Sequence, residues 1–117
     1  MIDPNELVVQ ILSDALPVDV GTEIPADRTV QYVQVSIGAD TSDEFLLTPR
    51  MELLCWGSSD RDAYRLARQA IDALHDASLD HDYLSAVVLV TMRRDEWSRT
   101  GQSRYLVEVD LTINTDE

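Results

Sequence analysis

The chain has 117 residues, with 22 acidic and 9 basic side chains and a net charge of −13 at neutral pH. Every basic residue is Arg. This charge argues against direct, sequence-specific recognition of DNA or RNA, because nucleic-acid binding depends on Lys and Arg displacing condensed counterions. No apolar run approaches the length of a membrane span, and the first residues lack the basic-then-apolar pattern of a secretory signal, so we expect neither feature.

The N-terminal third predicts a helix, a loop and a strand. The helix begins at Asp3-Pro4-Asn5-Glu6, which combines a cap residue, a proline at the first helical position and a glutamate three residues after the cap. Apolar residues recur at helical spacing as far as Leu16, and Pro17 ends the helix. Residues 18–27 predict a loop, and the alternation within residues 28–37 predicts a strand with one buried face.

The middle of the chain predicts a strand that turns directly into a long amphipathic helix. An acidic turn at residues 38–44 leads, as a hairpin, into the apolar strand 50–56, and Gly57 ends this strand. Ser59, with Asp62 three residues later, predicts the start of a helix. We expect this helix to pack on the sheet through an apolar stripe of Ala63, Leu66, Ala67, Ala70, Ile71 and Leu74.

Two further strands follow, at residues 83–93 and 103–114, joined by a polar loop at 94–102. We therefore expect a single α+β domain over residues 1–117, with an about four-stranded antiparallel or mixed sheet packed against two helices in the order α-β-β-α-β-β. In the last strand, one face carries Tyr105, Val107, Val109, Leu111 and Ile113. The predicted core includes Leu53, Trp56, Leu66, Ile71, Leu74, Val88, Val107 and Val109.

Few residues are candidates for catalysis. Cys55 and His75 are of the types that form a thiol nucleophile and its base, but an apolar strand favours a core role for Cys55. This lone cysteine cannot form an internal disulfide and fits a reducing, cytosolic compartment. Ligand types for a divalent metal occur together at His75, Asp80, His81 and Asp82. Their spacing matches no familiar motif, so we expect no enzyme, no metal and no cofactor.

Three arginines lie at helical spacing on one side of the second predicted helix, at Arg61, Arg65 and Arg68. They form either a solvent face, partly neutralised by Asp62, Asp72 and Asp76 in neighbouring turns, or a strip that meets acidic groups of a neighbouring subunit. Trp97, in the polar loop, is either a flap that packs on the core or an exposed anchor for a partner. Exposed ion pairs contribute little to affinity, so apolar groups such as Tyr64 and Trp97 must supply most of it.

Taken together, these residues resemble the small tail-terminator, or head–tail joining, proteins of long-tailed bacteriophages. The likeness rests on three features. The first is an N-terminal helix followed by a Pro-containing loop, with Asp27-Arg28 opening a strand. The second is the strand at 51–57, which contains a Trp and leads into an Ala-rich helix, and the third is the long final strand 104–114. It covers nearly the whole chain as a pattern of elements, without a signature motif. The chain departs from the family at Thr29 and in the acidic turn 39–44.

The resemblance implies a non-enzymatic virion protein of the tail or neck, assembled in the host cytoplasm. It would form a homo-oligomeric ring, generally a hexamer, that caps the tail tube protein and joins it to the head connector protein. Subunit contacts are expected at Arg61, Tyr64, Arg65, Arg68 and Trp97. DNA would pass through the ring without specific binding, and the acidic residues expected to face this channel are Asp40, Asp43 and Glu44.

Two other functions remain open from the sequence. An acidic DNA mimic, or another small protein-binding module, would occupy a basic site on a nuclease or repressor and would space its carboxylates along one exposed face. In this sequence the carboxylates are spread among helices, turns and both termini. A small enzyme that uses the region between His75 and His81 is the third alternative.

Overall fold

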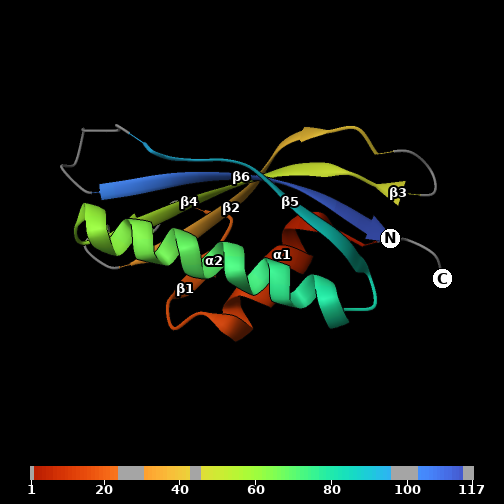
Figure 1. Cartoon of the computed structure of the whole chain (residues 1–117), viewed down its shortest axis with the longest axis horizontal. Coiled ribbons are helices and arrows are strands. Elements are labelled where there is room, and N and C mark those ends of the chain that lie inside the picture. The colour runs from red at the N-terminus through yellow and green to blue at the C-terminus, as the bar shows by residue number, and fades with distance from the viewer. Residues whose placement is uncertain (1, 24–30, 43–45, 96–102, 115–117) are drawn as a thin grey trace.

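A computed structural model describes residues 2–23, 31–42, 46–95 and 103–114. Within these ranges the chain forms two helices and six strands (Figure 1). In chain order they are α1 (Pro4–Ala15), β1 (Asp19–Gly21), β2 (Tyr32–Asp40), β3 (Leu46–Leu47), β4 (Pro49–Gly57), α2 (Asp60–Asp80), β5 (Leu84–Arg94) and β6 (Ser103–Asn114). Neither described helix is both long and apolar enough to cross a bilayer.

The sheet is mixed. Three antiparallel pairings join β2 to β4, β4 to β6 and β6 to β5, whereas β1 pairs in parallel with the start of β2. The two-residue strand β3 extends the register of β4 along β6, because Leu46 faces Asn114 just as Arg50 faces Asp110. The described sheet therefore has β1 and β5 at its two edges.

The α+β class and the two helices are confirmed, but the predicted strand number and order are wrong. The described residues form six strands, and their elements follow the order α-β-β-β-β-α-β-β. The additional strands are β1, inside the predicted loop 18–27, and β3. Both are too short for an alternating pattern to appear in the sequence. The predicted turn at 38–44 also begins later, because β2 continues through Asp40, although β2 and β4 do form the expected antiparallel pair.

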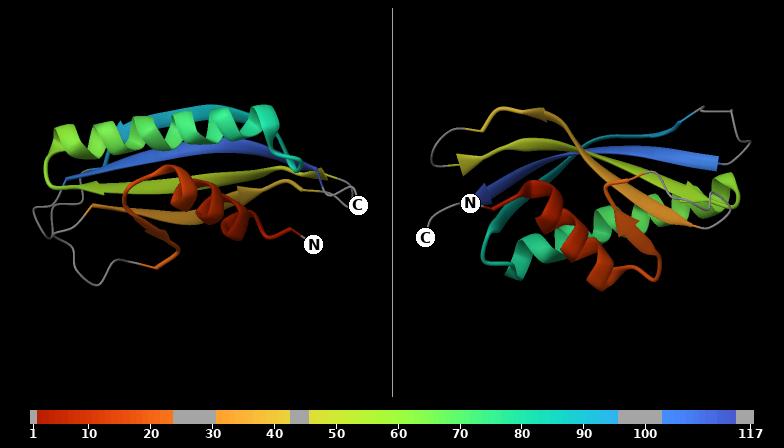
Figure 2. Two further views of the ribbon diagram at one scale, coloured as in Figure 1. Left: turned by 90° about the horizontal axis from the view of Figure 1, so that it is seen from below. Right: turned by 180° about the vertical axis from the view of Figure 1, so that it is seen from behind.

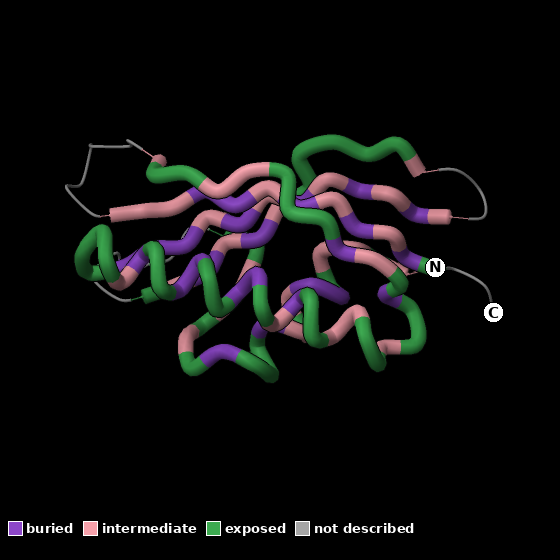
Figure 3. Tube along the Cα trace, in the orientation of Figure 1, coloured by how far each residue is buried: buried purple, intermediate pink, exposed green. Residues whose placement is uncertain are grey.

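Both helices cover the same face of the sheet and leave the other face open (Figures 1 and 2). Helix α2 packs against β4, β5 and β6, and α1 packs against β1, β2 and α2. The main core lies between these two layers, as the buried stretches in Figure 3 show. Of the predicted core residues, seven are buried, namely Leu53, Trp56, Leu66, Ile71, Leu74, Val107 and Val109.

The prediction for Val88 is wrong, because its side chain is 58% exposed. Val88 faces Asp110 in an edge strand that pairs only with β6 among the described strands. The pairing also shifts by one residue between Leu84 and Ala86 and again between Leu89 and Thr91. Such irregularities move side chains from one face of the sheet to the other, so an apolar run in β5 does not give a continuously buried strand.

Trp56 is buried as predicted, but on the other face of the sheet from the main core. Side chains alternate along a strand, and the cross-strand neighbours of Trp56 are Tyr32 and Arg104. The Arg104 guanidinium lies 4.7 Å from the centroid of the indole ring, a cation–π contact. Arg104 also forms an ion pair with Asp95. A polar side chain thus covers the tryptophan where the helices do not.

Candidate interaction surface

Two features fix the start of α2, namely an N-cap and the close approach of the first helical turn to Gly57. The Ser59 hydroxyl accepts a hydrogen bond from the Asp62 backbone N–H at 3.1 Å, as the sequence predicts. A Cβ at Gly57 would overlap the backbone of Asp62 and Ala63, so only glycine lets the helix begin this close to the end of β4. This geometry lays the apolar stripe of α2 on the sheet and turns the opposite side to solvent.

The three predicted arginines lie together on this solvent side. Arg61, Arg65 and Arg68 are all exposed, and their spacing of four and three residues places them along one line of the helix. Within the described part of the chain, none of the three forms an ion pair with a neighbouring turn. Asp62, one of the expected partners, instead accepts a hydrogen bond from the Ser58 hydroxyl at 2.6 Å. The arginines are therefore available to another molecule.

Tyr64 lies beside these arginines on α2 and packs against the sheet. Its ring packs edge-to-face on Tyr105, with centroids 5.6 Å apart and an angle of 72° between the rings. The residue remains 48% exposed. Tyr64 is thus held in position by the sheet while part of its ring faces solvent.

The second half of α2 carries the opposite charge. Asp72 and Asp76 continue the line of the arginines at helical spacing, and Asp80 lies at its end. All three are exposed. From the sequence we expect such aspartates only as intrachain partners of the arginines, and the separation into a basic half and an acidic half is not predicted. The periodic spacing from Arg61 to Asp76 was the signal that could have revealed it.

Of the predicted acidic channel residues, only Asp40 is described. It is exposed at the end of β2, and its carboxylate accepts hydrogen bonds from the backbone N–H of Ser42, at 2.9 Å, and from the Ser42 hydroxyl. These bonds lower the pKa of Asp40, the side-chain bond contributing most. Asp43, Glu44 and the predicted interface residue Trp97 lie outside the described residues.

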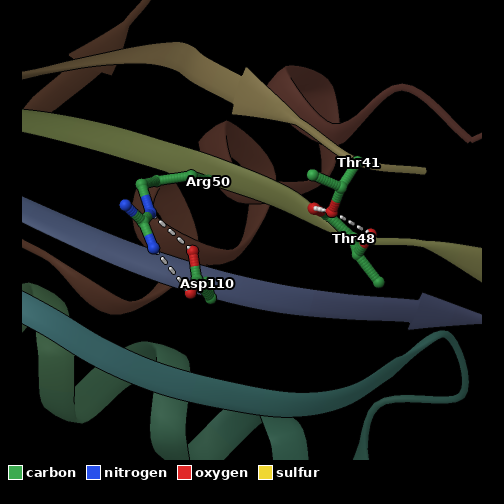
Figure 4. A network of polar contacts seen from close by, with 4 residues as sticks. All are labelled: Thr41, Thr48, Arg50 and Asp110. Carbon is green, nitrogen blue, oxygen red and sulfur yellow. Dashed lines mark hydrogen bonds and ion pairs between the residues drawn. The ribbon is translucent and has the colours of Figure 1, made fainter.

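The open face of the sheet holds a polar pair that the sequence interpretation did not single out (Figure 4). The Arg50 guanidinium donates two hydrogen bonds to the Asp110 carboxylate, at 2.8 and 3.1 Å. The pair lies beside a shallow hollow of about 410 Å³, across which Thr41 and Thr48 share a hydroxyl hydrogen bond of 2.8 Å. Hydrogen bonding to Arg50 lowers the pKa of Asp110 and raises that of Arg50.

Like charges also meet on this open face. Glu52 and Glu108 lie directly opposite each other on β4 and β6, two residues along each strand from Arg50 and Asp110 and so on the same face. Directly opposed like charges destabilise a sheet. Arg50 offsets part of this repulsion, because Glu108 also raises the pKa of the Arg50 guanidinium. The centre of the open face is therefore acidic.

The residues considered for chemistry do not form a reactive group in the described structure. Cys55 is fully buried, and desolvation raises the pKa of its thiol to about 12, so the thiolate nucleophile is not populated near neutral pH. His75 is exposed on α2, and His81 accepts a hydrogen bond from the Tyr83 backbone N–H at 3.2 Å. Among the described residues, no group of three or more His, Cys, Asp or Glu is placed to hold a metal ion.

The sequence matches none of the protein-family models and none of the curated proteins with which it was compared.

Proposed function

We propose that this chain is a structural protein of a long-tailed bacteriophage, which forms a homo-oligomeric ring that caps the tail tube and joins it to the head connector. We start from the resemblance of three stretches of the sequence, namely the N-terminal helix, loop and strand, the strand-to-helix unit at 51–57, and the final strand 104–114. Its place would be the neck of the virion, and assembly would take place in the host cytoplasm. It needs no catalytic group from the chain.

The observation that carries the proposal is the exposed face of α2. A protein with 22 acidic and 9 basic residues displays three arginines together on one helix, where none has an ion-pair partner among the described residues. Self-association of so acidic a chain is opposed by its net charge. Cations gathered at a contact reduce that repulsion locally. Arg61, Tyr64, Arg65 and Arg68 are therefore the proposed subunit contacts, and Trp97 is proposed with them on sequence grounds alone.

An acidic inner surface would suit the passage of DNA. Asp40 is exposed and, with its lowered pKa, ionised at neutral pH. Carboxylates repel the phosphate backbone, whereas Lys and Arg would hold it by counterion release. We propose that Asp40, with Asp43 and Glu44 beyond the described residues, faces the channel of the ring.

Tube capping tests the proposal. Tail tubes are polymerised from the tail tube protein of the phage that encodes this chain, with and without the wild-type protein, and their lengths are measured by electron microscopy. The wild type should stop growth and give short tubes. Arg65→Glu and Arg68→Glu should leave a folded protein that fails to cap, so that tubes overgrow.

Arg93→Glu is the matched control, because Arg93 is exposed on β5, away from the α2 face, and the charge change is the same. It should cap like the wild type. Tubes that grow to the same length with and without the wild-type protein would rule out the proposed function. Normal capping by Arg65→Glu, Arg68→Glu and Trp97→Ala would leave the function standing and show that the contact residues are wrong.

A further inference from the structure

We propose that the α2 face binds the α2 face of a second copy of this chain, so that the basic half of one helix lies against the acidic half of the other. The basic half is Arg61, Arg65 and Arg68, and the acidic half is Asp72, Asp76 and Asp80. This inference rests on the proposed assembly into a homo-oligomer, and it names the partner of that surface.

Charged side chains of α2 lie along one line of the helix. Successive residues of an α-helix turn by about 100°, so the spacing from Arg61 through Arg65, Arg68 and Asp72 to Asp76 keeps five charges within a narrow exposed stripe. The stripe changes sign once, between Arg68 and Asp72, close to the middle of α2. Helix α2 has 21 residues. At a rise of about 1.5 Å per residue, the charged stripe spans most of a helix about 30 Å long.

This distribution of charge does not stabilise the helix itself. The macrodipole favours acidic residues at the N-terminus and basic residues at the C-terminus of a helix. Asp60 and Asp62 in the first turn follow this rule, but the last turn has no basic residue and ends with Asp80. Among the described residues, neither half of the stripe forms an ion pair within the chain. The segregated charges are therefore left for an external partner.

The charged stripe is complementary to a second copy of itself. In an antiparallel overlay of two α2 helices, Arg65 faces Asp76 of the other copy and Arg68 faces its Asp72, and each pairing occurs twice. Around a ring, the basic half of each α2 would instead lie side by side with the acidic half of the next copy, in a head-to-tail contact. A basic DNA-binding domain would satisfy only the acidic half of the stripe, and a nucleic acid only the basic half, and each would meet like charge along the other half.

Two exposed apolar residues support the same partner. Leu79 is 85% exposed at the acidic end of the stripe, and Tyr64 is 48% exposed at the basic end. In either alignment the end that holds Tyr64 approaches the end of the other helix that holds Leu79. An apolar contact beside the ion pairs would then exclude water from both.

Complementary charge reversal tests the pairing. One variant carries Arg61→Glu, Arg65→Glu and Arg68→Glu, so its stripe is acidic throughout; the other carries Asp72→Arg, Asp76→Arg and Asp80→Arg, so its stripe is basic throughout. Each variant alone should self-associate at least about tenfold more weakly than the wild type, and a 1:1 mixture should regain the wild-type affinity. Sedimentation measures the assembly, and NMR titration of the labelled acidic variant with the unlabelled basic one maps the contact.

The control separates specific pairing from general charge attraction. The variant Glu6→Arg, Asp14→Arg and Asp19→Arg makes the same change in net charge at exposed positions in α1 and β1. Mixed with the acidic variant, it should not restore association. The inference would be overturned if this control restored association. It would also be overturned if both charge-reversal variants self-associated as strongly as the wild type.

The size of the assembly keeps this inference distinct from the proposed function. A closed ring that depends on both halves of the stripe supports both proposals. A pair that depends on both halves but never grows beyond two copies supports the α2 contact and contradicts the ring. Capping of tail tubes by variants that have lost the α2 contact supports the function and contradicts the contact.

Discussion

At the scale of single residues, burial rather than apolar character alone decides how much a side chain contributes to stability. Leu74 and Val107 are fully buried between α2 and the sheet, whereas Val88 is largely exposed although it belongs to an equally apolar stretch of sequence. The buried pair loses both its packing partners and its transfer free energy when truncated. The exposed valine loses little of either.

We therefore expect Leu74→Ala and Val107→Ala to lower the free energy of unfolding by about 2–5 kcal/mol each. Val88→Ala, the matched control at an exposed site, should change it by no more than about 0.5 kcal/mol. Chemical denaturation followed by circular dichroism measures all three. A loss under about half a kcal/mol at both buried sites would mean that the packing of α2 on the sheet is misassigned.

The Arg50–Asp110 pair makes a pH-dependent contribution to the stability of the folded protein. The pKa of Asp110 is lower in the folded protein than in the unfolded chain, since Arg50 donates hydrogen bonds to the ionised carboxylate. Stability from this group is present above the unfolded pKa of a carboxyl, about 3.9, and is lost as the pH falls through the lower folded pKa. Arg50→Gln should therefore raise the pKa of Asp110, as measured by carbon-detected NMR titration.

Asp40 provides the internal control for that titration. Its pKa is lowered by Ser42 rather than by an arginine. Arg50→Gln should leave the pKa of Asp40 unchanged, and Ser42→Ala should raise it without affecting Asp110. If Arg50→Gln moves both carboxyl groups alike, long-range charge rather than the hydrogen bonds sets these pKa values.

At the scale of elements, local sequence signals were enough where an element is long and periodic. The cap at Ser59 and the apolar stripe predicted α2, and the alternation of residues 103–114 predicted β6 with its observed bounds. Strands β1 and β3 have three and two residues and depend on neighbours far along the chain for their hydrogen bonds. Short strands of this kind form through tertiary pairing, which no local window contains.

The cap of α2 gives a test at this scale. Ser59→Ala removes the acceptor for the Asp62 backbone N–H and should lower the free energy of unfolding by about 1 kcal/mol. Ser58→Ala removes only an exposed side-chain hydrogen bond to Asp62 and should cost less than about 0.5 kcal/mol. Equal losses in thermal or chemical unfolding would show that Ser59 does not act as the cap.

At the scale of the whole molecule, the distribution of charge could be predicted only in part. The arginine strip follows from helical spacing within α2. The Arg50–Asp110 pair joins residues 60 positions apart and depends on the register between β4 and β6. The acidic centre of the open face, at Glu52 and Glu108, depends on the same register. A composition with a net charge of −13 does not specify where on the surface its carboxylates gather.

This acidity predicts that the protein does not bind DNA. Fluorescence anisotropy with a labelled duplex should show negligible affinity at physiological salt, because few cations are available to release counterions. Lowering the salt concentration should not produce strong binding. Tight binding that weakens steeply as salt rises would contradict the acidic channel and favour a nucleic-acid role instead.

Electron cryomicroscopy of tail tubes assembled with the wild-type protein tests the central claim most directly. The account predicts one closed ring of this chain at a single end of each tube, with the α2 helices at the contacts between successive subunits. Tubes assembled with Arg65→Glu should lack the ring. Bare ends in the presence of the wild-type protein, or protein bound along the whole length of the tube, would contradict the account.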